Sequence, residues 1–147
     1  MTILRVFPDT TIWIAALGRP EGGSGLIFKF AKENRIKIIS SPMIFEEVKR
    51  NLHKLKKVTM KDFECLITET APEIIKISSK DLIPWKNIVH PKDEHVLAGA
   101  KKGKSNLLVS FDKDHILENK SLQGKFKAGP FNAGEFIEWF LAFEKGC

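Results

Sequence analysis

The 147-residue chain contains no tyrosine and only two cysteines, Cys65 and Cys147. The cysteines are far apart and form no CxxC pair, so neither a disulfide framework nor a zinc cluster is expected. No apolar run approaches the roughly 18 residues that a membrane helix needs. The first residues also lack the charged and then apolar segments of a secretory signal. We therefore expect a cytoplasmic protein with reduced thiols and no contact with a membrane.

The composition favours one folded domain over residues 1–147. Apolar residues make up 43% of the chain, which is enough for a hydrophobic core, and no repeat or low-complexity segment divides it. Basic residues outnumber acidic ones by 24 to 18, and 20 of the 24 are lysines. This balance favours diffuse attraction to a polyanion over the paired hydrogen bonds with which arginine reads bases.

Short apolar runs alternate with helical patterns along the chain. We expect strands at 3–7, 36–39, 74–77 and 107–111 and helices at 11–17, 24–33, 42–53, 59–70, 94–102 and 132–144, with an irregular segment at 79–92. The helix starts carry capping signals at Ser24, at Ser41 before Pro42, at Thr59 with Asp62, and at Asn132 with Glu135. Such alternation is typical of a parallel sheet with helices on both faces.

Carboxylates directly follow two of the expected strands. Asp9 ends the first, and Asp112 ends the fourth, with Asp114 two residues later. In parallel sheets, ligands bind outside the carboxyl ends of the strands. Like charges held close together are costly unless a cation compensates them, and hard oxygen ligands suit Mg²⁺ or Mn²⁺.

Further acids lie near expected helix starts and could reach the same edge of the sheet. These are Glu46, Glu47 and Asp93. Each acid has another explanation when taken singly, because it could cap a helix, favour a helix N-terminus, stabilise a turn or face solvent. Their joint placement favours one metal site.

Four motifs that contain these acids follow one another along the chain, at 6–11, 41–48, 92–100 and 107–114. In this order they resemble the PIN domain family of metal-dependent nucleases, and in particular its VapC-like toxin branch. The resemblance implies an α/β fold with three layers, α/β/α, and a central parallel sheet of four to five strands. It also implies a ribonuclease that hydrolyses RNA phosphodiester bonds with one or two Mg²⁺ or Mn²⁺ ions. An antitoxin protein and a second copy of the chain are the partners that it implies.

The resemblance also assigns site residues. The catalytic and metal-binding acids fall on Asp9, Glu47, Asp93 and Asp112, and the accessory residues are Asp114, which also binds metal, Ser110, Thr10 and Thr11. One position departs from the family pattern, because Thr11 stands where asparagine is usual. A threonine hydroxyl is shorter than an amide and has fewer hydrogen-bonding groups, so the departure bears on the fine geometry of the site.

Basic residues and histidines lie near these motifs. A run without acids follows Glu47 and could track an RNA backbone, or could be a solvated helix face: Lys49, Arg50, Lys54, Lys56 and Lys57. His95 and His115 each lie beside an acid motif. We expect them to be surface residues or neighbours of the ligands, although one of them could touch substrate.

Three other functions compete with the nuclease. A non-catalytic module that binds RNA or protein could share the fold and keep its acids for a structural ion. A phosphoacceptor receiver domain needs an acidic pair after the first strand, but Asp9 is the only acid there, so we discount this alternative. A phosphate-binding loop is excluded, because the glycine-rich segment 22–25 is followed by Leu26 rather than by lysine and a hydroxyl residue.

Overall fold

The computed structural model describes residues 3–146 and has a parallel sheet at its centre. The four strands lie in the order β3-β2-β1-β4, with β1 at Leu4–Pro8, β2 at Ile36–Ser40, β3 at Glu73–Ile74 and β4 at Leu107–Val109. Val6 in the middle of β1 lies opposite Ile38 on one side and Leu107 on the other. Strands β1, β2 and β4 are almost wholly buried, as expected when helices cover both faces of a sheet, whereas both residues of the edge strand β3 are exposed.

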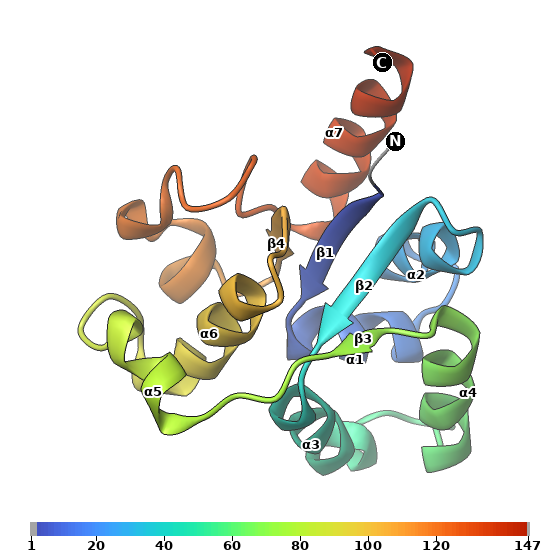
Figure 1. Ribbon diagram of the computed structural model, residues 1–147. Coiled ribbons are helices and arrows are strands. Elements are labelled where there is room, and N and C mark those ends of the chain that lie inside the picture. The colour runs from blue at the N-terminus through green and yellow to red at the C-terminus, as the bar shows by residue number, and fades with distance from the viewer. Residues whose placement is uncertain (1–2, 147) are drawn as a thin grey trace.

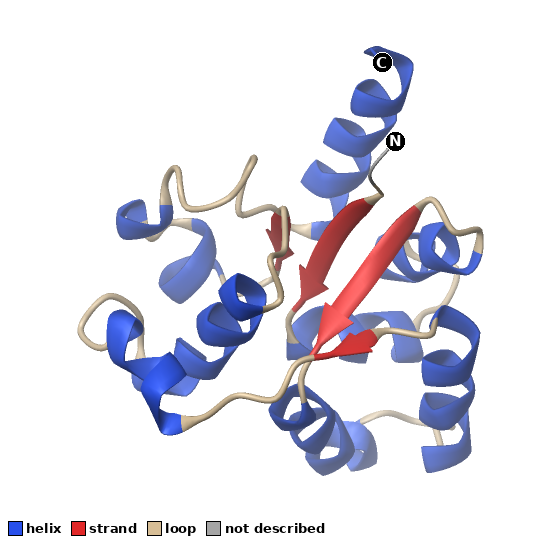
Figure 2. Ribbon diagram, in the orientation of Figure 1, coloured by secondary structure: helices blue, strands red, loops and turns tan. Residues whose placement is uncertain are grey.

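Helices join the strands and cover the sheet (Figure 1). Their bounds are α1 Thr10–Gly18, α2 Gly23–Lys32, α3 Pro42–Asn51, α4 Met60–Thr70, α5 Ser79–Leu82, α6 Glu94–Lys102 and α7 Ala133–Gly146. Helices α1, α2 and α7 pack together on one side, whereas α5 and α6 pack together on the other. The expected three-layer α/β/α architecture is confirmed. Figure 2 shows that the strands are short and that loops occupy much of the segment between β4 and α7.

Most of the expected helix starts are confirmed, and one is wrong. Ser41 accepts a hydrogen bond from the Ile44 amide at the start of α3, and a capping box opens α4. Ser24 was expected to cap the next helix, but α2 begins at Gly23 with Gly22 as its capping residue, and Ser24 is buried within the helix. The chain entering α2 is folded tightly over the helix, because a Cβ on Gly25 would lie 1.8 Å from the carbonyl oxygen of Pro20. This tight entry displaces the start from the serine.

The third strand also differs from its expected position. The sequence pattern predicts a strand at 74–77, but the strand pairs only at Glu73–Ile74, because its partner β2 ends at Ser40. Ile75 and Ile77 instead pack towards α6, where Gly103 and Gly99 leave room for them. The segment 79–92, expected to be irregular, contains the short helix α5 and further single turns.

An aromatic cluster fixes the helix that follows the first strand. Trp13 of α1 contacts Phe28 of α2, Phe45 of α3 and Phe63 of α4, with ring centroids 4.5–5.8 Å apart. Edge-to-face contacts of this kind stabilise beyond the area that they bury. The start of α1 is therefore held rigidly beside the carboxyl end of β1. Within residues 3–146, no helix is both long and apolar enough to cross a membrane.

Candidate metal centre

The acids meet at the carboxyl edge of the sheet, where the strand order changes direction. The chain passes from β1 outward to β2 and β3 and then returns to place β4 on the other side of β1. Asp9 directly follows β1, and Asp112 comes three residues after β4. Ligand sites in open α/β sheets lie at such a switch point.

Asp9 is buried and fully hydrogen-bonded. Its side chain is 4% exposed and caps α1 by accepting from the amides of Thr11 and Ile12. The hydroxyls of Thr11 and Ser110 also donate to its two carboxylate oxygens. Burial raises the pKa of Asp9 to about 6, and the hydrogen bonds from Ser110, Thr11 and the two amides only partly oppose this rise.

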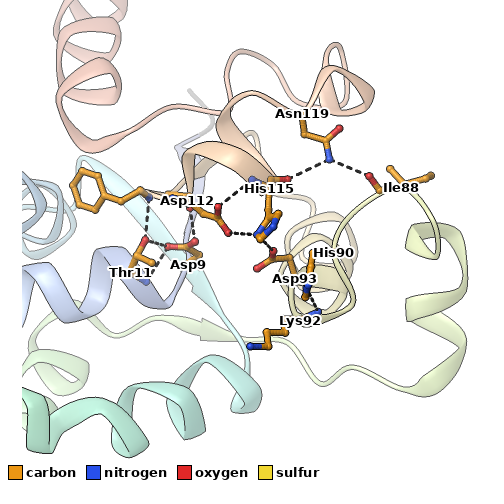
Figure 3. A network of polar contacts seen from close by, with 11 residues as sticks. Asp9, Thr11, Ile88, His90, Lys92, Asp93, Asp112, His115 and Asn119 are labelled. Carbon is orange, nitrogen blue, oxygen red and sulfur yellow. Dashed lines mark hydrogen bonds and ion pairs between the residues drawn. The ribbon is translucent and has the colours of Figure 1, made fainter.

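Two hydroxyls connect Asp9 to the end of β4 (Figure 3). Thr11 accepts from the Phe111 amide at 2.9 Å while donating to Asp9. Ser110 accepts from the Asp112 amide at 2.9 Å and donates to the other oxygen of Asp9. The threonine at the position where the family usually has asparagine thus orients Asp9 and fixes the following loop at the same time.

Glu47 lies on α3 in a separate polar contact. Its Oε1 accepts from the Thr10 hydroxyl at 2.6 Å and lies 3.1 Å from Nε2 of His95, which is 5% exposed. Partial burial would raise the pKa of Glu47, but the close contact with His95, the hydrogen bond from Thr10 and the charge of Arg50 outweigh it and lower the pKa. The neighbouring Glu46 is exposed and pairs with Lys49.

Asp93, Asp112 and His115 form the one group of possible ligands that the described part of the chain brings together. One ligand atom from each lies within 4.8 Å of the other two. Asp93 precedes α6 but does not cap it by a side-chain hydrogen bond. Its Oδ2 is buried and accepts no hydrogen bond from residues 3–146. Burial, and then the negative charge of Asp112, raise the pKa of Asp93, although the nearby histidines oppose this rise.

These features fit a divalent cation. A buried carboxylate oxygen without a donor is costly, and so is its repulsion by a second carboxylate. An ion held by Asp93 and Asp112 would remove both costs. The residues present therefore match the oxygen-rich ligand set that Mg²⁺ and Mn²⁺ take.

Other residues expected at the site lie outside the Asp93–Asp112–His115 group. Asp114 is exposed on the turn Lys113–Leu117, and Asp9 and Glu47 are held in the neighbouring hydrogen-bond networks. The basic run begins on the exposed side of α3 and continues through Lys56 and Lys57, which line a hollow of the surface beside α4.

Two histidines contribute more to this edge than the sequence pattern indicated. His95 contacts Glu47 across two helices, and His115 contacts Asp93 and Asp112. The contacts of His95 with Glu47 and of His115 with Asp93 join residues of different elements, and the contact of His115 with Asp112 lies within one turn. The only available signal was the position of each histidine beside an acid motif.

Comparison with known proteins assigns the family. The PIN domain model matches residues 5–114, and the chain belongs to the PIN domain family. Among solved structures, it is similar to a chain of VapBC2 from Rickettsia felis, crystallised bound to a DNA fragment from their promoter. The TM-score is 0.55 with 16% sequence identity over 76% of this chain and 90% of that chain, which establishes a shared fold. No curated protein matches significantly.

Proposed function

We propose that this PIN domain is a metal-dependent ribonuclease that hydrolyses RNA phosphodiester bonds, and that it acts as the toxin of a toxin–antitoxin pair. The observation that carries the proposal is the buried Oδ2 of Asp93, which accepts no hydrogen bond from residues 3–146 and lies beside Asp112. Nuclease families with this fold generally use divalent ions, and the geometry offers one a place to bind.

Each site residue has a distinct task in this proposal. Asp93 and Asp112 hold the ion. When bound, the ion supplies Lewis-acid chemistry, which activates water for attack on phosphorus and neutralises charge developing on the phosphate. Asp9 is positioned by Ser110 and Thr11, and Glu47 is positioned by Thr10. Both acids lie in the adjoining hydrogen-bond networks, where they orient water or complete the set of acids. Asp114 is the accessory acid at the exposed rim.

The substrate proposal is supported by the surface charge. The chain carries a net charge of +6 although several acids are committed to the sheet edge. The surface away from that edge is therefore more basic than the total charge indicates. Lysines bind nucleic-acid backbones without reading sequence, and we assign this task to Lys49, Arg50, Lys54, Lys56 and Lys57.

The partner proposal is supported by the similar solved structure, which is a VapBC complex. We propose an antitoxin that covers this site, with a homodimer as the toxin unit. Expression of the chain alone should arrest growth, and co-expression of the product of a small adjacent reading frame should restore it. Growth arrest that Asp112→Asn does not relieve would argue against a toxin acting through this site.

The nuclease proposal is tested with purified full-length protein and single-stranded RNA. We expect cleavage with Mn²⁺, none with EDTA, and a strong loss with Asp112→Asn. The asparagine can still accept the His115 amide hydrogen bond that Asp112 Oδ1 accepts at 3.0 Å, so the local turn is retained. Glu138→Gln, an exposed change on α7, is the matched control. Cleavage that persists in EDTA or in Asp112→Asn would refute the proposal.

A non-catalytic binding module is the alternative, and one observation favours it. The hydrogen bonds that Asp9 accepts cap helix α1 and connect the end of β1 to the end of β4, which is a structural role. Asp9 lies outside the Asp93–Asp112–His115 group. RNA binding without cleavage, in protein shown to bind Mn²⁺, would select this alternative.

A further inference from the structure

His115 faces the two carboxylates of the candidate metal centre. Its Nδ1 lies 3.3 Å from Oδ2 of Asp112 and 3.7 Å from Oδ2 of Asp93. The latter is the buried oxygen that lacks a hydrogen-bond donor among residues 3–146. Two oxygens and one nitrogen therefore converge on the same small volume (Figure 3).

Neighbouring groups hold His115 in this position. Its amide donates to Oδ1 of Asp112 at 3.0 Å, which leaves Oδ2 of Asp112 facing the ring. Nδ2 of Asn119 donates to the carbonyls of His115 and Ile88 at 3.2 and 3.0 Å, and so ties the turn carrying His115 to the segment before α6 (Figure 3).

A second imidazole packs against the first but points its Nδ1 elsewhere. The His90 and His115 ring centroids are 4.6 Å apart. Nδ1 of His90 accepts a hydrogen bond from the Lys92 amide at 3.1 Å. That atom is already engaged, so His90 restricts the ring of His115, while Nδ1 of His115 remains directed at the carboxylates.

We propose that His115 is a nitrogen ligand of the metal centre, beside Asp93 and Asp112, and that it makes the centre prefer Mn²⁺ to Mg²⁺. The inference rests on the metal site of the proposed function. Mg²⁺ is bound through carboxylates, phosphates and water, whereas an imidazole ligand favours transition metals. Coordination through Nδ1 would leave the ring proton on Nε2.

The test measures binding of Mn²⁺ alone, and separately of Mg²⁺ alone, to the intact chain by calorimetry. His115→Gln removes the nitrogen and keeps a polar side chain. We expect it to weaken Mn²⁺ binding by at least about tenfold, since even partners of metal ligands contribute that much, and to change Mg²⁺ binding little. Electron spin-echo spectroscopy of bound Mn²⁺ should show ¹⁴N coupling in the unmodified protein and none in His115→Gln.

Two control variants make the result specific. His53→Gln changes an exposed histidine in the turn after α3 and should keep both the Mn²⁺ affinity and the ¹⁴N coupling. His90→Gln should also keep the ¹⁴N coupling, because Nδ1 of His90 is engaged by the Lys92 amide and because Asp112 and Asn119 still hold the turn that carries His115.

The outcomes separate this inference from the proposed function. RNA cleavage with bound Mn²⁺ but without ¹⁴N coupling, or coupling that survives in His115→Gln, would overturn the inference and leave the nuclease intact. Absence of both metal binding and RNA cleavage would overturn both.

Discussion

Replacing Asp9 with asparagine should stabilise the metal-free protein at pH 8 while impairing metal-dependent activity. Asp9 is buried, and burial raises its pKa from 3.8 to about 6. The folded state therefore holds the proton more tightly than the unfolded state. This contribution to stability is fully present below about pH 4 and is lost as the pH rises to about 6. Asparagine is neutral at every pH and avoids the loss.

The size of the effect follows from the pKa shift. The pKa of Asp9 rises from 3.8 to about 6, and a tenfold change in proton affinity corresponds to about 1.4 kcal/mol, so the charged carboxylate costs about 3 kcal/mol above pH 6. Asparagine keeps one oxygen that can accept from the amides at the start of α1, but its NH₂ group cannot accept the hydrogen bond that Ser110 donates to Oδ2 of Asp9. That lost hydrogen bond costs about 1 kcal/mol. We expect a net gain of about 2 kcal/mol at pH 8.

The assay is urea unfolding in EDTA, followed by tryptophan fluorescence from pH 4 to pH 8. The difference in unfolding free energy between Asp9→Asn and the unmodified protein should grow between pH 4 and 6 and then level off, whereas Glu138→Gln should show no such growth. A difference that does not change with pH, or a variant less stable at pH 8, would refute this electrostatic reasoning.

Three further changes test other parts of the structure. Gly25→Ala places a Cβ 1.8 Å from a backbone oxygen and should lower the unfolding free energy by about 3 kcal/mol, whereas Gly23→Ala, whose Cβ has ordinary contacts, should change it little. Thr10→Val removes the 2.6 Å hydrogen bond to Glu47, so the lowered pKa of Glu47 should rise towards its ordinary value in carboxyl ¹³C NMR titrations; an unchanged pKa would contradict the assigned contact. Replacing Lys54, Lys56 and Lys57 with glutamine should make the slope of the logarithm of the single-strand RNA binding constant against the logarithm of the salt concentration less steep by about 2. The same change at Lys29, Lys80 and Lys145 should leave this slope as it is. Equal slopes for the two triple variants would reject the proposed RNA surface.

Local chemistry made much of the fold predictable. The Ser41-Pro42 pair and the Thr59–Asp62 box act within one turn, and both open helices where expected. The alternation of apolar runs and helical patterns likewise identified the parallel sheet. The end of β3 was missed because it depends on where its partner β2 ends. The start of α2 was missed because it depends on the close approach of Pro20 to Gly25.

The site was predictable only as far as topology determines it. Strand ends brought Asp9 and Asp112 to one edge, as the pattern indicated. The contact of His95 with Glu47 depends on how two helices pack, and that of His115 with Asp93 depends on the turn after β4. Neither contact follows from spacing along the chain. The metal-binding and catalytic tasks of the acids remain predictions.

The anomalous scattering of crystals of this protein soaked in Mn²⁺ tests directly whether Asp93 and Asp112 bind a metal ion. We expect an anomalous peak within ligand distance of the carboxylates of Asp93 and Asp112, and no such peak in crystals of Asp112→Asn. Well-ordered carboxylates with no peak between them, or a peak bound only elsewhere on the surface, would contradict a metal centre at this edge of the sheet.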